Sequence, residues 1–210
     1  AKEYFPVLEE RHFVGALLDP NEGHLDPSGT THAYAKAAQK RGADVILRNR
    51  VLAITPRAGG GFDLMTEQGP IFAENVVNAG GLWAKQVGRM VGLDLPVTPM
   101  EHHYLVTETI PEVAALSAEL PVTVDLDGFS YARQEAKGYL LGVYERNPRH
   151  WRMEGAPWDY GMELIPEDID RIYARWTAAR AAGMLARMPE PSAADAQAVA
   201  AVATAHALTG

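Results

Sequence analysis

Apolar positions in the first part of the chain form short runs between turn-forming residues, with one clear helix signal. The run Val14–Leu18 predicts a strand. Asp26 followed by Pro27 is typical of a helix start, because an aspartate side chain caps free N–H groups and proline tolerates the first helical position. The sequence therefore predicts a helix from Pro27 to Arg41.

Shorter apolar and β-branched segments follow, separated by glycine turns. They predict strands at 43–47, 51–55, 62–66, 71–72 and 75–78. Those from 51 onward are close enough along the chain to form an antiparallel meander. A helix from Leu82 to about Val91 is expected next, with Gly92 as its stop.

The pattern changes near Pro96, where we place a domain boundary. Strand-like segments then recur at 102–107, 122–125, 129–133 and 139–144, as in an antiparallel sheet. A helix is predicted from Ile165 to about Met184, and the alanine-rich stretch 191–210 predicts a weak helix or a tail. The fold class expected is α+β: an α/β portion followed by an antiparallel sheet with helices.

Charge and composition narrow the possible partners. The net charge of -8 and pI near 5.3 disfavour nucleic acid and anionic membranes, which both reward a basic surface. No apolar run approaches the ~18 residues of a membrane span, and the first residues do not resemble a signal peptide. The absence of cysteine excludes disulfides and thiolate chemistry. We expect a cytoplasmic protein whose sequence, lacking Met at position 1, begins internally or after processing.

Two stretches could contact a ligand directly. Small residues in Val77–Ala84 follow a predicted strand and precede a helix, so their N–H groups could bind a phosphate; close packing of strand on helix is the alternative. His102 and His103 are neighbours on one predicted strand and must point to opposite faces. One of them could exchange protons in a cavity, or both could be structural, and no metal site is expected from the pair.

A third stretch, Gly128–Glu135, places Tyr131 and Arg133 on one strand face. A guanidinium beside a phenol could hold a carboxylate, because arginine offers a planar pair of donors. The alternative is an aromatic core strand whose arginine extends to the solvent. The chain contains no serine-nucleophile, P-loop, zinc-protease or G-x-G-x-x-G motif.

Five motifs occur in an order that resembles the dimethylglycine dehydrogenase/sarcosine dehydrogenase branch of the D-amino-acid-oxidase-like flavoenzymes. The resemblance covers about Val14 to Pro189. The motifs are Asp19–Pro27, Val77–Ala84, Glu101–Glu108, Tyr131–Glu135 and Trp158–Leu164.

This resemblance implies specific roles. His102 and Tyr131 match the family's active-site histidine and tyrosine, so both are expected to be catalytic and to bind substrate, with Arg133 as a further substrate contact. Val51, Ala79, Gly80 and Tyr131 are expected to contact FAD. The implied organisation is a substrate-domain strand and lead-in at 1–16, a partial FAD-binding domain at 17–96, a substrate-binding domain at 97–190 and an alanine-rich tail at 191–210.

The implied chemistry is oxidation of an N-methyl amine, such as dimethylglycine or sarcosine, by hydride transfer to FAD. The family's glycine-rich pyrophosphate loop is missing from this sequence, so we expect weak or absent FAD binding by this chain alone. A folate or electron acceptor would be bound only by segments outside it. Two alternatives remain: a non-catalytic binding or regulatory module of the same shape, and an unrelated α+β domain.

Overall fold

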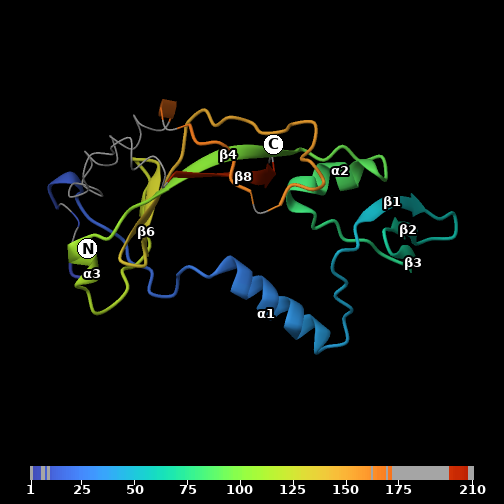
Figure 1. Ribbon diagram of the computed structural model, residues 1–210, viewed down its shortest axis with the longest axis horizontal. Helices are drawn as coiled ribbons and strands as arrows, with labels where there is room; N and C mark the ends of the chain where they lie inside the picture. The colour runs from blue at the N-terminus through green and yellow to red at the C-terminus, as the bar shows by residue number, and fades with distance from the viewer. Residues whose placement is uncertain are drawn as a thin grey trace. The chain divides into compact units, whose positions relative to one another are not determined.

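The computed structural model describes residues 2–5, 8, 10–161, 163–168, 170–171 and 199–207 (Figure 1). Among these, the residues before 24 together with 99–151 and 160–204 form one compact unit. Residues 24–98, 152–159 and 205–207 form the other. The division at 98/99 lies two residues beyond the predicted end of the first large domain, and the loop 152–159 groups with 24–98 rather than with the residues around it.

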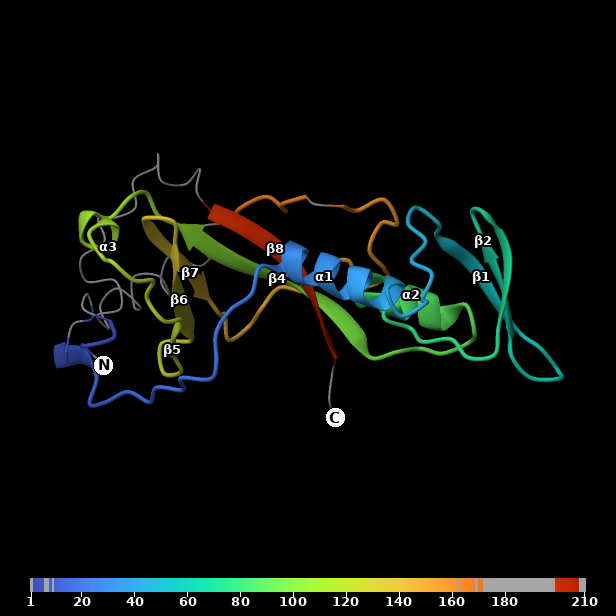
Figure 2. The ribbon, with the colours of Figure 1, turned by 90° about the horizontal axis from the view of Figure 1, so that it is seen from below.

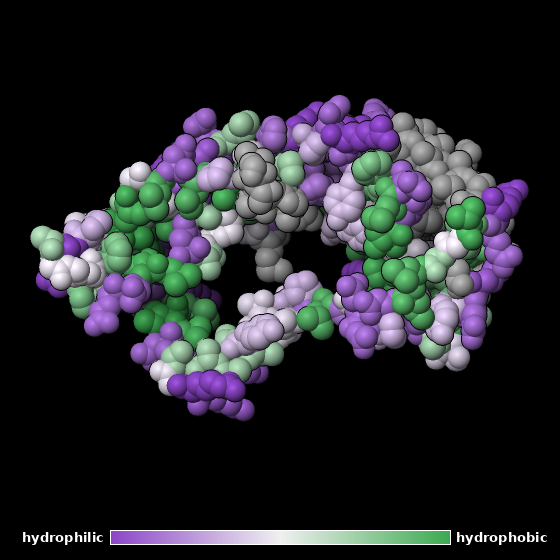
Figure 3. Space-filling view, turned by 180° about the vertical axis from the view of Figure 1, so that it is seen from behind, coloured by the Kyte–Doolittle hydropathy of each residue, from purple (hydrophilic) through white to green (hydrophobic). Residues whose placement is uncertain are grey.

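The unit of residues 24–98 begins with the predicted helix. Helix α1 (Pro27–Gln39) starts where the sequence indicates, with Asp26 accepting a hydrogen bond from the N–H of Gly29. Strands β1 (Val51–Pro56), β2 (Phe62–Thr66) and β3 (Gly69–Ala73) form the expected antiparallel meander in the order β1-β2-β3. Apolar side chains gather on the surface of this unit, visible as green at the left of Figure 3.

The predicted helix after the meander is also confirmed. It consists of one 3₁₀ turn, η2 (Gly81–Trp83), continued by α2 (Ala84–Arg89). The side chains of α2 hold the loop 152–159 by hydrogen bonds to its backbone. Gln86 donates to the carbonyl of Ala156 and accepts from its N–H, at 2.8 and 3.1 Å.

Three predicted strands are wrong. Residues 14–18, 43–47 and 75–78 have no strand pairing and follow irregular paths. Val14, Leu47 and Val77 are exposed at 112%, 76% and 88%, so these apolar residues have no sheet face to cover. Strand propensity expresses packing against neighbours more than a property of the backbone, and these segments lack such neighbours within the described residues. The lead-in 1–16 therefore contains no described strand, only the 3₁₀ turn η1 (Glu10–His12).

The other unit is built on a five-stranded sheet with the order β5-β6-β7-β4-β8. The strands predicted after Pro96 are confirmed as β4 (Val97–Val106), β5 (Thr123–Asp125), β6 (Ser130–Glu135) and β7 (Gly138–Val143), and the described pairs are antiparallel. A short helix, α3 (Pro111–Ala114), lies between β4 and β5 in sequence. Figure 2 shows β5, β6 and β7 beside β4.

One face of this sheet forms the core, and we call it the core face. Alternate residues of the strands point into it and are buried: Leu105, Ala132, Tyr139, Leu141 and Val143. All of these except Val143 form one cluster with Phe5, Leu8, Val113 and Leu120. Burying one such leucine or valine side chain stabilises the fold by roughly 1.5–3 kcal/mol, so the face that covers the core is strongly specified.

The expectation for the end of the chain is corrected. Strand β8 (Val199–Ala207) lies alongside β4 at the edge of the sheet (Figures 1 and 2), where a weak helix or tail was expected. Pairing with an existing sheet edge outweighs the helix propensity of alanine, which is a weak preference. Most of the predicted helix 165–184 lies outside the described residues.

Candidate functional site

The register of the sheet determines which side chains share the face opposite the core. Tyr104 of β4 and Tyr131 of β6 both pair with Gly142 of β7, so the three positions form one row across the sheet. His102 and Tyr144 belong to the next row, because alternate residues share a face. We call the surface formed by His102, Tyr104, Tyr131 and Tyr144 around Gly142 the aromatic face.

Tyr144 joins the two residues that the sequence singles out. Its ring meets that of His102 edge to face, with 5.4 Å between centroids and an angle of 80°. It also meets the ring of Tyr131 at 5.7 Å and 42°. Both distances lie within the range of favourable aromatic pairs. His102 and Tyr131 thus share one face through a common neighbour, which follows from the register of β4, β6 and β7. His103 points to the core face, as strand alternation predicts.

Gly142 makes room for Tyr131. A Cβ at position 142 would collide with ring carbons and the hydroxyl oxygen of Tyr131, so the tyrosine ring occupies the space of the absent side chain. Burial raises the pKa of Tyr131, Tyr144 adds to the effect and Arg133 opposes it. The phenol is therefore a neutral hydrogen-bond donor at physiological pH.

Arg133 lies on the same face of the sheet as Tyr131, and its guanidinium is already paired with an acidic side chain. Its Nη2 lies 2.6 Å from Oε2 of Glu135, two residues along the same strand. Its Nη1 donates to the carbonyl of Gln134 at 3.4 Å. A substrate carboxylate at Arg133 would compete with Glu135.

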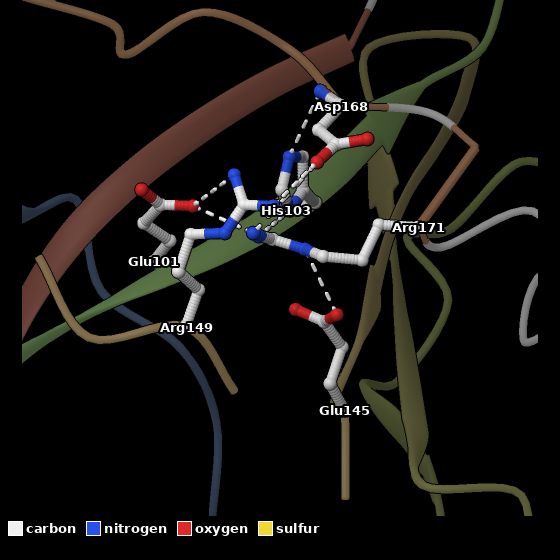
Figure 4. Close-up of polar contacts among 6 residues, drawn as sticks. All are labelled: Glu101, His103, Glu145, Arg149, Asp168 and Arg171. Carbon is white, nitrogen blue, oxygen red and sulfur yellow. Dashed lines mark hydrogen bonds and ion pairs between the residues drawn. The ribbon is translucent and has the colours of Figure 1, made fainter. Parts of the chain in front are cut away.

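The core face carries a cluster of charges beyond the apolar core, drawn in Figure 4. Arg171 is its centre: Nη1 lies 2.7 Å from Glu101 and Nε lies 2.9 Å from Glu145. Arg149 adds an ion pair with Asp168 at 3.3 Å. The side chains of Glu101, Glu145 and Arg171 are between 10% and 16% exposed, so these three are largely withdrawn from water, whereas Arg149 is 58% exposed.

His103 lies within this charge cluster and is 3% exposed. The backbone N–H of Asp168 donates to Nε2 at 3.3 Å, and Nη2 of Arg171 lies 3.1 Å from Nδ1. Both ring nitrogens thus face N–H groups, and a neutral imidazole can accept from only one of them. A second proton would leave neither nitrogen able to accept. Burial lowers the pKa of His103, with Arg171 as the second cause. Burial also raises the pKa of Glu145, against the effect of Arg171.

The turn before α2 fits a phosphate poorly at Gly80. The N–H of Gly80 donates to Oδ1 of Asn78 at 3.1 Å, and Nδ2 of Asn78 donates to the carbonyl of Ala84 at 2.9 Å. A Cβ at Gly80 would approach Asn78 and Ala84 to 3.0–3.3 Å, so local packing explains this glycine. At Gly80 the structure therefore favours the alternative of close packing over an N–H group available to a phosphate. Val51 starts β1 and pairs with Thr66.

Among the described residues, no group of three or more histidine, aspartate or glutamate side chains is arranged to hold a metal ion. In that same part of the chain, no helix has the length and apolar character required to cross a membrane.

Comparison with known proteins decides the family. Residues 1–204 match the family described as FAD dependent oxidoreductase. The chain belongs to this family. The motifs around His102 and Tyr131 indicate the same family.

Several known proteins are similar to this chain. The chain is 44% identical over 175 residues to mitochondrial dimethylglycine dehydrogenase of Mus musculus, covering 81% of this chain and 20% of that protein. It is 34% identical to mitochondrial sarcosine dehydrogenase of Mus musculus, covering 80% and 18%. The mitochondrial pyruvate dehydrogenase phosphatase regulatory subunit of Mus musculus is 32% identical, covering 82% and 21%. The chain spans about a fifth of the length of these relatives.

A solved structure supports the α+β fold. L-proline dehydrogenase from P. horikoshii matches 99% of this chain and 50% of its own chain, with a TM-score of 0.69 and 20% identity.

Sequence reasoning missed Tyr104, Gly142 and Tyr144 as members of the aromatic face. The strand around Tyr139–Tyr144 was predicted, but placing Tyr144 beside His102 requires the pairing register between β4 and β7.

Proposed function

We propose that the protein carrying this chain oxidises N-methyl amines, such as dimethylglycine or sarcosine, by hydride transfer to FAD. The observation that carries the proposal is the aromatic face, where His102 and Tyr131 contact the same ring of Tyr144. The names of the relatives at 44% and 34% identity support the substrate class.

FAD, when bound, supplies the acceptor for a hydride from the N-methyl carbon, which leaves an iminium on the substrate. His102 holds or removes the amine proton, because histidine exchanges protons near neutral pH. A free amine lone pair is needed before the N-methyl carbon can lose a hydride. Tyr131 donates a hydrogen bond from its neutral phenol and orients the substrate.

The remaining assignments also belong to this proposal. Arg133 binds the substrate carboxylate in competition with Glu135. Val51, Ala79 and Gly80 contact FAD, an assignment supported by the order of the motifs. Gly80 would do so through its Cα, because its N–H bonds to Asn78 and its carbonyl accepts from the N–H of Trp83.

The test uses the whole protein with FAD bound. Anaerobic addition of dimethylglycine or sarcosine should bleach the flavin absorbance, and glycine, which has no N-methyl carbon, should not. Bleaching by neither N-methyl amine would refute the proposed reaction, provided that dithionite still reduces the same flavin.

A second candidate is a non-catalytic regulatory module of the same fold. The 32% identity to a pyruvate dehydrogenase phosphatase regulatory subunit favours this reading, because that relative is named for regulation. The two candidates differ in one simple observation. A purified protein without yellow flavin absorbance, even after incubation with FAD, supports the regulatory module.

A further inference from the structure

The aromatic face has an unusual composition for a polar-substrate surface. Its rings surround a backbone position without a side chain, Gly142. The ring of Tyr144 is 45% exposed and contacts those of His102 and Tyr131. The acidic side chain on the same side of the sheet, Glu135, is paired with Arg133. A ligand that lies against Tyr144 therefore meets ring faces and edges, with no unpaired carboxylate in the described residues of this face.

Ring faces select among ammonium groups. A primary ammonium carries three N–H donors and needs acceptors, which aromatic rings supply poorly. A methylated ammonium has few or no N–H groups, and its charge spreads over methyl groups that pack against rings. Aromatic surfaces bind such cations by the attraction of the ring quadrupole, which contributes about 0.5–1 kcal/mol at exposed sites and more when water is excluded.

We propose that Tyr144, supported by Tyr131 and Tyr104, recognises the methylated ammonium group of the substrate in its cationic form. The inference rests on the proposed function, since it assumes that the amine binds this face. It makes Tyr144 a residue that determines specificity for N-methylated amines over amines without methyl groups. The neighbouring His102 then removes the proton from the bound ammonium.

The test compares two ligands of the same shape in the FAD-loaded protein. Betaine, the trimethylated glycine, has a permanent cation and no lone pair, so it binds without losing a hydride. In 3,3-dimethylbutanoate a neutral carbon replaces the nitrogen, and the carboxylate is kept. Isothermal titration should show betaine binding about fivefold tighter, the ratio that corresponds to ~1 kcal/mol of cation–ring attraction.

Two variants assign the preference to the ring of Tyr144. Tyr144→Phe keeps the ring and should keep the preference for betaine. Tyr144→Leu keeps similar bulk without the ring and should bind both ligands equally. Equal binding of the two ligands by the unmodified protein, binding of neither, or an unchanged preference in Tyr144→Leu would each overturn the inference.

The outcome is distinguishable from failure of the proposed function. If dimethylglycine bleaches the flavin while the two ligands bind equally, the reaction stands and the recognition by Tyr144 falls. If dimethylglycine leaves the flavin oxidised while betaine is preferred through Tyr144, the recognition stands and the reaction falls.

Discussion

At the scale of single residues, neighbouring histidines on β4 have opposite surroundings. His102 contacts the exposed ring of Tyr144, whereas His103 lies between the N–H of Asp168 and the guanidinium of Arg171. Strand alternation turns the two side chains to opposite faces, and the residues packed on each face provide the rest of the difference. Burial and Arg171 lower the pKa of His103.

The surroundings of His103 predict a pH-dependent contribution to stability. Its pKa is lowered in the folded protein from an ordinary value of 6.5, so the unfolded chain binds its proton first. The stabilisation from neutral His103 is complete above pH 6.5 and is lost as pH falls below that value. Urea unfolding of the protein and of His103→Asn should give a difference in unfolding free energy that shrinks on acidification. A constant difference between pH 7.5 and 5.5 would contradict this, and His32→Asn on α1 is the exposed control.

The close approach of Tyr131 to Gly142 predicts that a side chain at position 142 lowers both stability and ligand affinity. Gly142→Ala places a methyl group where the ring of Tyr131 lies, so the ring must move. Overpacking of this kind typically costs about 1–3 kcal/mol of stability. Betaine affinity should fall together with stability in Gly142→Ala, whereas Gly59→Ala, in an open turn, should change neither. Unchanged affinity in Gly142→Ala would show that Tyr131 does not contribute to the ligand surface.

At the scale of elements, helix α2 determines where the loop 152–159 lies. Besides the two hydrogen bonds of Gln86, Trp83 donates to the carbonyl of Pro157 at 2.9 Å and Arg89 donates to that of Glu154 at 3.0 Å. These bonds join residues about 70 positions apart in sequence. They attach the loop to the unit of residues 24–98.

Gln86→Ala should release this loop. It removes two hydrogen bonds, each worth about 0.5–1.5 kcal/mol, and leaves the backbone of Ala156 without its partner. Limited proteolysis should then cut within 152–159 faster than in the unmodified protein. Gln39→Ala, at the exposed end of α1, is the matched control. An unchanged cleavage rate in Gln86→Ala would mean that Trp83 and Arg89 suffice to hold the loop.

Sequence patterns predicted the helices and strands whose own residues contain a capping motif or a strand-like apolar pattern. Asp26 and Pro27 located α1, and alternation located β4 to β7. The composition of the segment 43–47 predicts a strand, yet no strand of the described residues pairs with it. The loop 152–159 and the contact of Tyr144 with His102 depend on register and distant side chains, which local patterns do not contain.

At the scale of the whole molecule, the family assignment implies FAD. The described turn around Gly80, however, provides few free N–H groups for the phosphates of FAD. The N–H of Gly80 is used by Asn78, and the sequence contains no G-x-G-x-x-G loop. Contacts with the phosphates usually provide much of a protein's affinity for a dinucleotide.

We therefore predict that the 210-residue chain alone binds free FAD weakly or not at all. Quenching of flavin fluorescence during titration with the chain measures the affinity. A dissociation constant of about 1–5 μM, equivalent to ~8 kcal/mol of binding free energy, would contradict the prediction.

The central claim is that the face of the sheet carrying His102 is the amine side of a flavoenzyme. The most direct test is the rate of flavin bleaching by dimethylglycine in the FAD-loaded protein and in its His102→Ala variant. Loss of a proton-handling group should slow bleaching by about tenfold or more at neutral pH. The variant should keep its flavin and its thermal midpoint, because His102 lies outside the core. Bleaching at the unmodified rate would reduce His102 to a structural residue and contradict the assignment of this face.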